Sequence, residues 1–438
     1  MENLIAKDLK FIWHPYTQMK EANEFPPILI ERAKGVKLYD QDGRFYYDAI
    51  SSWWCNVHGH NHPKINSAIK KQLKSLDHIL FAGFTHRPAI SLSEKLVSIA
   101  PGELSKVFFS DNGSTAVEVA LKMSFQYWYN IGKRNKQKFI SLDYAYHGDT
   151  VGTMSVSGVD LFNDKFRPLF FDGFKVSTPY CYRCPQGKER KSCKLECIKA
   201  LEKILHEKSE EICAIILEPL LLGAGGMIIY PKEYLAQTAR LAKKYNVHLI
   251  LDEVATGFGR TGKMFACEHV KNIKPDFLCL SKGITGGYLP LAATLTTDKI
   301  YQAFYAPYEK KKTFFHGHTY TANPIACAAA IASLKIFKTE KTLKKINRII
   351  PWFHREMEKF RDFPVVGDVR FLGLVGALEL RGFNSKERIG FKICQKALKN
   401  HLVLRPLGNI IYLFPPLCIT KAELKDILKR LRAVISTI

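Results

Sequence analysis

The sequence predicts an α/β fold in two parts, a large domain on a mostly parallel β-sheet and a smaller α+β domain after it. Three observations support this prediction. In the middle of the chain, short aliphatic runs alternate with stretches long enough for helices, which is typical of a parallel sheet covered on both faces. Polar residues directly follow the aliphatic runs. Beyond residue 330, long amphipathic stretches and glycine-rich runs replace the alternation.

The expected sheet strands follow one another along the chain, with helices between them. We expect strands at 106–110, 138–142, 212–217, 247–251 and 277–280, and helices at 115–129 and 232–244. The polar residues that follow these strands are Asp111, Asp143, Glu218, Asp252 and Lys282. In an open α/β sheet the ligand lies at the carboxyl ends of the strands, so these residues mark the candidate site.

The last part of the chain is expected to form the smaller domain. The pattern predicts helices at 342–360, 387–398 and 421–434, and strand-like segments at 365–380 and 410–414. We therefore divide the chain into a large domain at 66–330 and a small domain at 331–438, and we expect the segment at 1–65 to contribute to the small domain and to the candidate site.

The composition excludes several classes of protein. No apolar run reaches the ~18 residues of a membrane span, and the first ten residues lack the apolar core of a secretory signal. The 11 cysteines are an odd number, which favours reduced thiols and a cytoplasmic protein without membrane association. The net charge is +24, but the lysines are spread in small groups, which indicates a solvated surface and no nucleic-acid partner.

Two adjacent strand ends carry an acid and a lysine. Asp252 follows an aliphatic strand, and Lys282 follows the next strand and precedes Gly283. Taken alone, the aspartate is more often a cap, whereas a lysine directly after an apolar strand and before a glycine-rich turn is more often inside a site than on the surface. Together they are the two groups that pyridoxal phosphate (PLP) chemistry requires, an acid for the ring nitrogen and a lysine for the aldehyde.

Two further segments suit the same cofactor. Gly113 and Ser114 lead into the helix expected at 115–129, where free N–H groups can bind a phosphate, although an ordinary N-cap is the simpler interpretation. Tyr146 follows the strand expected at 138–142 and could stack on a planar ring, although many loop aromatics do not.

The segment at 252–262, Asp-Glu-Val-Ala-Thr-Gly-Phe-Gly-Arg-Thr-Gly, followed by Leu280-Ser281-Lys282-Gly283, resembles the signature of class III aminotransferases. The motifs at 13–19 and 51–54 and the Arg405-Pro406 pair resemble the branch of that family that serves biotin synthesis. The resemblance runs from residue 10 to residue 420. It implies PLP fold type I, with a mostly parallel seven-stranded sheet in a large domain that binds PLP.

The resemblance implies amino transfer to 8-amino-7-oxononanoate, giving 7,8-diaminononanoate, with S-adenosylmethionine as the donor. No acid stands next to Tyr16 or Trp53 in the sequence, which favours a sulfonium over the compact ammonium of lysine. Lysine as donor is one alternative, and another ω-aminotransferase acting on lysine, ornithine or a polyamine is a second. A basic, zinc-bearing module that binds nucleic acid is the alternative from another class.

The resemblance also implies roles for residues that match the family's motifs. Lys282 would carry PLP as a Schiff base and move a proton, and Asp252 would keep the ring nitrogen protonated. The implied catalytic residues are Lys282, Asp252 and Tyr16. The implied cofactor-binding residues are Gly113, Ser114, Tyr146, Asp252, Lys282, His318 and Thr319. The implied substrate-binding residues are Trp53, Tyr146, Lys282, Gly317 and Arg405.

Two of these residues imply a partner subunit. In the family, the pair at His318 and Thr319 completes the phosphate site of the other chain, so the resemblance implies a homodimer with shared active sites. His318 stands where many relatives have proline, so Thr319 and the backbone would carry that contact.

A basic segment at 179–197 contains four cysteines spaced C-x2-C-x8-C-x3-C. They are Cys181, Cys184, Cys193 and Cys197. The spacing suits a tetrahedral thiolate site for zinc, and less well an iron–sulfur cluster. Four reduced surface thiols are the alternative that we favour, so no residue is assigned as a metal ligand.

Overall fold

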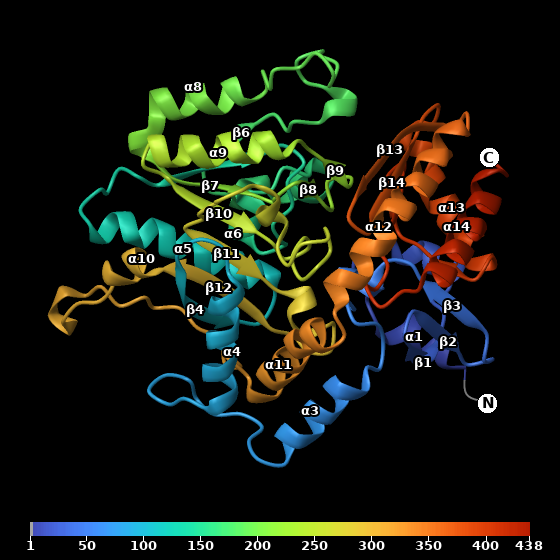
Figure 1. The fold of residues 1–438 in the computed structure, drawn as a ribbon, viewed down its shortest axis with the longest axis horizontal. Coiled ribbons are helices and arrows are strands. Elements are labelled where there is room, and N and C mark those ends of the chain that lie inside the picture. The colour runs from blue at the N-terminus through green and yellow to red at the C-terminus, as the bar shows by residue number, and fades with distance from the viewer. Residues whose placement is uncertain (1–2) are drawn as a thin grey trace.

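The computed structural model describes residues 3–438, and a seven-stranded sheet forms the centre of its larger part (Figure 1). The strand order is β4-β12-β11-β10-β7-β5-β6. The strands are β4 (Leu104–Ser110), β5 (Lys138–Leu142), β6 (Phe174–Val176), β7 (Ile212–Leu217), β10 (His248–Asp252), β11 (Phe277–Leu280) and β12 (Ala292–Thr297). β12 runs antiparallel to both neighbours and the other neighbouring pairs are parallel, which confirms a mostly parallel sheet.

Sequence patterns missed two of these strands. β6 has only three residues, and β12 reads Ala-Ala-Thr-Leu-Thr-Thr, which lacks an aliphatic run. By contrast, every residue of β7, β10 and β11 is buried, because helices cover both faces of the sheet. That burial explains why these three central strands are almost uniformly apolar in the sequence.

Helices pack on both faces of this sheet. The helices of this part are α3 (Pro63–Leu73), α4 (Arg87–Ile99), α5 (Gly113–Asn130), α6 (Val151–Ser155), α7 (Asp160–Asn163), α8 (Ile198–Lys208), α9 (Lys232–Lys244), α10 (Asp298–Gln302) and α11 (Pro324–Thr339). Alternate residues of β10 enter different core clusters: Ile250 packs with α5, and Leu249 and Leu251 with the cluster that includes α8 and α9.

A four-stranded sheet with the order β13-β14-β17-β16 forms the C-terminal part. Its strands are β13 (Val366–Leu372), β14 (Val375–Leu380), β16 (Pro406–Leu407) and β17 (Ile410–Leu413), and its helices are α12 (Thr342–Glu358), α13 (Ile389–Lys399) and α14 (Lys421–Ile435). The strand-like stretch expected at 365–380 is therefore a hairpin. Gly373, with φ +56°, lies in its turn between Leu372 and Val375.

The N-terminal segment lies beside the C-terminal part, as Figure 1 shows for the blue strands and the red helices. It holds α1 (Leu4–Phe11), β1 (Ile30–Lys34), β2 (Lys37–Asp40), β3 (Phe45–Asp48) and α2 (Ser51–Trp54). β3 pairs in parallel with β15 (Leu402–Val403), so the two ends of the chain share one sheet. This pairing supports the predicted grouping of 1–65 with the C-terminal residues, while the domain boundaries stay a prediction.

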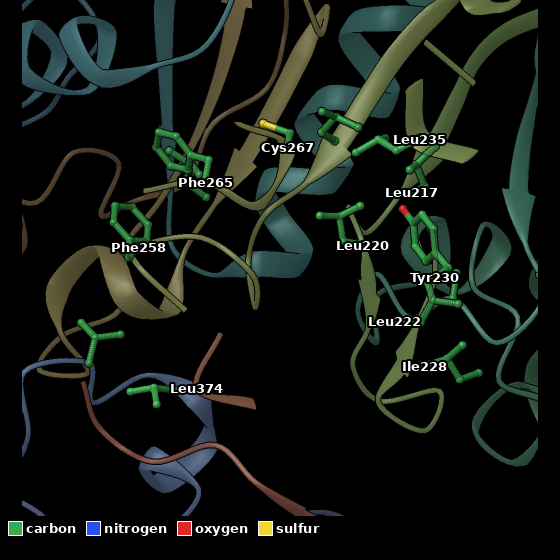
Figure 2. Packing of buried hydrophobic residues seen from close by; sticks show 14 of the residues in the cluster. Leu217, Leu220, Leu222, Ile228, Tyr230, Leu235, Phe258, Phe265, Cys267 and Leu374 are labelled. Atoms are coloured by element: carbon green, nitrogen blue, oxygen red, sulfur yellow. The ribbon is translucent and has the colours of Figure 1, made fainter. Parts of the chain in front are cut away.

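A short hairpin of β8 (Leu221–Leu222) and β9 (Ile228–Ile229) extends from the end of β7. Figure 2 shows Leu220, Leu222, Ile228 and Tyr230 gathered around it. The Tyr230 hydroxyl donates a hydrogen bond to the carbonyl of Glu218 at 2.7 Å, which ties the hairpin to the strand end. Among the described residues, no helix is long and apolar enough to cross a membrane.

Candidate active site

A cavity of about 470 Å³ opens where the parallel strands end. Its walls include residues that follow four different strands. They are Asp111, Gly113 and Ser114 after β4, Tyr146 and His147 after β5, Glu218 after β7, and Lys282 after β11, with Asp252 at the end of β10. Four of the five strand-end polar residues that we singled out therefore share one cavity, and Asp143 does not line it.

Lys282 reaches into this cavity from the turn after β11. Its Nζ lies 4.7 Å from the ring centroid of Trp54. Removal from solvent lowers the pKa of its amine, and the negative charges of Asp252 and Glu218 oppose that change. Lys282 also has φ +45°, a strained conformation for a non-glycine residue, of a kind that concentrates at functional sites.

Asp252 is held by two hydrogen bonds. Its Oδ1 accepts from the Val254 N–H at 3.0 Å, and its Oδ2 accepts from His147 Nδ1 at 2.8 Å. Asp252 and His147 are both buried. We singled out the Tyr146-His147-Gly148 segment for its tyrosine and missed the histidine, although a histidine beside a predicted cofactor-binding aromatic was a usable signal.

The start of α5 offers an anion-binding surface. Asn112 caps the helix through the Thr115 N–H at 3.1 Å, and the first two helical residues, Gly113 and Ser114, line the cavity. A Cβ on Gly148 would lie 2.1 Å from Ser114 Oγ, and one on Gly113 would lie 2.6 Å from a Val254 methyl. These glycines keep open the space that a phosphate at the helix start requires.

Aromatic residues and one arginine stand together beside the cavity. The Arg405 guanidinium lies 4.2 Å from the ring centroid of Trp53 and 5.5 Å from that of Tyr16. Tyr16 donates a hydrogen bond to Asp149 at 2.7 Å, and burial raises its pKa to about 12. The acid beside Tyr16 is thus not a sequence neighbour, because folding brings Asp149 to it from a distant segment.

Glu218 is a second buried acid of the cavity. Its two carboxylate oxygens accept from the backbone N–H groups of Tyr146 at 3.0 Å and Gly223 at 2.9 Å. Its pKa is raised to about 7, mainly by burial, with the charge of His147 opposing the rise and the charge of Asp252 adding to it. Burial therefore makes Glu218 a weaker acid than an exposed glutamate.

Gly317, His318 and Thr319 do not line the cavity of their own chain. Gly317 and Thr319 are exposed, and His318 Nδ1 lies 3.5 Å from Asp111 Oδ2 at the cavity's edge. A single chain therefore leaves these three residues outside the cavity, and their predicted roles stay predictions.

The four cysteines of the segment at 179–197 line a second, small cavity. Burial raises the pKa of Cys181, and it raises that of Cys197 to about 11, so these thiols hold their protons. Within residues 3–438, no group of three or more His, Cys, Asp or Glu side chains is placed to hold a metal ion. The four thiols share one small cavity, and the two interpretations, reduced thiols and a zinc site, both stay predictions.

Comparisons with known proteins agree on one family. The model of the class-III aminotransferases matches residues 17–435. An adenosylmethionine-8-amino-7-oxononanoate aminotransferase of Geobacter sulfurreducens is 45% identical over 98% of this chain and 97% of its own. The crystal structure of the enzyme of that name from Methanocaldococcus jannaschii has a TM-score of 0.94 at 43% identity. The match covers 99% of this chain and 98% of the other. An omega transaminase from Pseudomonas jessenii, solved in complex with PMP, has a TM-score of 0.93 at 32% identity. The match covers 100% of this chain and 98% of the other.

Proposed function

The chain belongs to the class-III aminotransferases, and from that membership we propose that it transfers an amino group to 8-amino-7-oxononanoate. The product is 7,8-diaminononanoate of biotin synthesis, and the donor is S-adenosylmethionine. The observation that carries this proposal is the likeness, over nearly the whole length of both chains, to relatives that bear the name of this reaction.

PLP is the cofactor of this family, and the cavity's residues fit it. Asp252 provides the carboxylate for the ring nitrogen, and the start of α5 provides N–H groups for the phosphate, where Gly113 and Gly148 leave room. Lys282 provides the amine. When bound, PLP supplies an aldehyde that combines with amino groups and a ring that accepts electrons.

Lys282 carries out the proton transfers. Its amine takes the proton from the donor's α-carbon, and the lowered pKa keeps a larger share of it neutral and ready to act. Asp252 serves this step by holding the ring nitrogen's proton, and His147 fixes the carboxylate that does so.

The substrates enter past the aromatic residues. Arg405 binds the carboxylate of 8-amino-7-oxononanoate through two parallel hydrogen bonds, and Trp53 and Tyr16 pack against its apolar chain. Asp149 binds the donor's ammonium group. S-adenosylmethionine and lysine both carry that group, so Asp149 suits either, and the choice of donor rests on the relatives' name.

The proposal includes a homodimer in the cytoplasm. The exposed Gly317 and Thr319 and their neighbour His318 serve the cavity of a second copy, since they do not line their own. All 11 cysteines are unpaired thiols, as a reducing compartment requires.

The test uses the two half-reactions separately. The PLP-loaded enzyme is mixed with S-adenosylmethionine or with lysine, and the absorption change from the carbonyl to the amine form of the cofactor is followed. We expect conversion by S-adenosylmethionine alone. The amine form is then mixed with 8-amino-7-oxononanoate, and mass spectrometry should find 7,8-diaminononanoate. Conversion by lysine alone would refute the donor, and failure to aminate 8-amino-7-oxononanoate would refute the acceptor.

A further inference from the structure

We propose that Arg370, in the C-terminal sheet, positions the pocket acid Glu218 by holding the turn at 223–227, and that the cysteine-bearing segment at 179–197 keeps Arg370 in place. Arg370 touches neither cavity nor substrate, so it is a positioning residue. The proposal rests on the cofactor site proposed above, and it holds for any amino donor or acceptor.

Arg370 lies on β13 and reaches across to the loop between β8 and β9. Its Nη2 donates to the Gly226 carbonyl at 2.8 Å, and its Nε donates to the Met227 carbonyl at 3.1 Å. The N–H groups of the same two residues both donate to the Gly223 carbonyl, at 3.1 and 2.9 Å. The Arg370 guanidinium thus binds one end of a turn whose N–H groups bond back to the Gly223 carbonyl.

The turn at 223–227 contacts two residues of the pocket, Glu218 and Trp54. The Gly223 N–H donates to Glu218 Oε2 at 2.9 Å, one of the two hydrogen bonds that orient this carboxyl group. A Cβ on Gly223 would lie 3.0 Å from the Trp54 ring, so the turn packs directly on the indole. The Trp54 ring lies 4.7 Å from Lys282 Nζ. A shift of the turn therefore moves the walls next to both Glu218 and Lys282.

Buried acids hold Arg370 from the other side. Its Nη1 donates to Glu379 at 2.6 Å and to Asp368 at 3.0 Å. The cysteine-bearing segment also binds Glu379. The Tyr180 hydroxyl donates a hydrogen bond to this carboxylate, and Arg183 Nε donates another at 2.7 Å. In Figure 1 the loop before α8 reaches toward β13 and β14. The segment at 179–197 is thus bound to Glu379, which forms the ion pair that orients Arg370.

The geometry of the guanidinium makes this role specific to arginine. A planar group with five donors can bind two carbonyls and two carboxylates at once, whereas a lysine ammonium offers three donors at a single point. Arg361 is the matched comparison on the same network. It donates to Asp368 at 3.3 Å and to the Val369 carbonyl at 2.8 Å, and its hydrogen bonds do not reach the turn at 223–227.

The consequence for the pocket is a change in proton affinity at Glu218. The ionisable groups that face this carboxyl are His147 after β5, Asp252 at the end of β10 and Lys282 after β11, and the Tyr230 hydroxyl binds its carbonyl. The Gly223 N–H favours the ionised form and so holds the pKa of Glu218 down to about 7. If the turn loosens, that hydrogen bond weakens and the pKa rises.

The experiment compares four variants with the parent, all loaded with PLP and without substrate. They are Arg370→Lys, Tyr180→Phe, Arg361→Gln and Glu218→Gln. The absorption of the bound cofactor is titrated against pH, and melting temperatures are recorded. The parent should show a transition near pH 7 that Glu218→Gln abolishes. Arg370→Lys should move it upward by about one pH unit, the size expected when a charged group loses one hydrogen bond. Tyr180→Phe should move it less, and Arg361→Gln should leave it unchanged.

Three outcomes would overturn the proposal. They are a parent without the transition, unchanged midpoints in both Arg370→Lys and Tyr180→Phe, and an equal shift in Arg361→Gln. If Arg370→Lys does not fold, the Tyr180→Phe midpoint decides alone. Because no substrate is used, an enzyme that shows these shifts but does not aminate 8-amino-7-oxononanoate would refute the proposed function and leave this inference standing.

Discussion

Lys282 and Asp252 come from the ends of adjacent strands and meet at one cavity. A buried charge without a partner is costly. Asp252 has His147 as its partner, and the carboxylates of Asp252 and Glu218 face Lys282. The cavity therefore combines an amine whose pKa is lowered with an acid held by two hydrogen bonds. Both features suit an amine that must shed its proton and a carboxylate that must keep its charge.

Replacing Lys282 tests its proposed role as the residue that carries the cofactor. Lys282→Ala should lower the rate by roughly 10³-fold or more, because both the covalent attachment and the base are lost. Borohydride reduction of the PLP-loaded parent, followed by peptide mapping, should find the cofactor on Lys282. Lys136 is the natural comparison, since it is also deeply buried but binds backbone carbonyls away from the cavity. Label on Lys136 or any other lysine would disprove the assignment.

Replacing Asp252 tests the electronic role of the carboxylate. Asp252→Asn should retain PLP but lower the rate by roughly 10²–10⁴-fold, because a neutral amide cannot hold the ring nitrogen's proton. Rate and PLP content are measured on the same preparation. Asp276→Asn is the control, since Asp276 precedes β11 at the other end of the sheet and binds the Leu249 N–H at 2.8 Å. Near-normal turnover in Asp252→Asn, or an equal loss in Asp276→Asn, would contradict the role.

At the scale of elements, the cavity depends on where helices and turns begin. α5 starts at Gly113, directly after β4, so its free N–H groups face the strand ends where Lys282 and Asp252 also lie. The segment after β5 comes against this helix start, and Gly148 makes the closest approach, with φ +134°. A phosphate can bind there because no side chain at Gly148 fills the space.

Gly148→Ala tests this approach. The added methyl would overlap Ser114 Oγ, so we expect PLP affinity to fall about tenfold or more, the equivalent of ~1–3 kcal/mol of local strain. Affinity is measured by titrating the PLP-free enzyme with PLP. Gly132→Ala is the control, because Gly132 also has positive φ, +85°, but has open space around its Cβ position. A loss of affinity that is the same in both variants would show general backbone strain and refute the phosphate site.

At the scale of the whole molecule, one chain builds most of the cavity and leaves the turn at 317–319 outside it. In the proposed homodimer, this turn would complete the cavity of the second copy. The two ends of the chain lie in one sheet, β15 against β3, beside the C-terminal sheet that carries Arg370. The first and last parts of the chain therefore lie together beside the sheet that carries Arg370.

Mixed dimers test the shared site. Lys282→Ala and Thr319→Val should each be impaired alone, yet a refolded equal mixture should regain about a quarter of the parent's activity, because half of random pairs are mixed and each has one intact site. Light scattering should show a dimer. Activity in the mixture that equals the average of the two separate variants would refute a shared site, as would a fully active monomer.

Local patterns in the sequence determined the sheet strands that are buried on both faces, the class of fold and the residues that end those strands. Each of these features depends on a few neighbouring residues whose periodicity reflects the burial of their own element. Lys282 and Asp252 at adjacent strand ends suggested the cofactor, and the resemblance of 252–262 and 280–283 to the class III signature made it specific. The short β6 and the weakly apolar β12 were missed, because neighbouring strands determine their pairing.

Only the tertiary structure decided which distant residues meet. Asp149 reaches Tyr16 across 133 positions, and Arg370 reaches Gly226 across 144, although nothing in the local sequence marks either pair. The four cysteines of the segment at 179–197 likewise meet only in the tertiary structure, where they line one small cavity. A contact between remote segments is set by how helices and sheets pack, and packing depends on shape and burial over the whole chain.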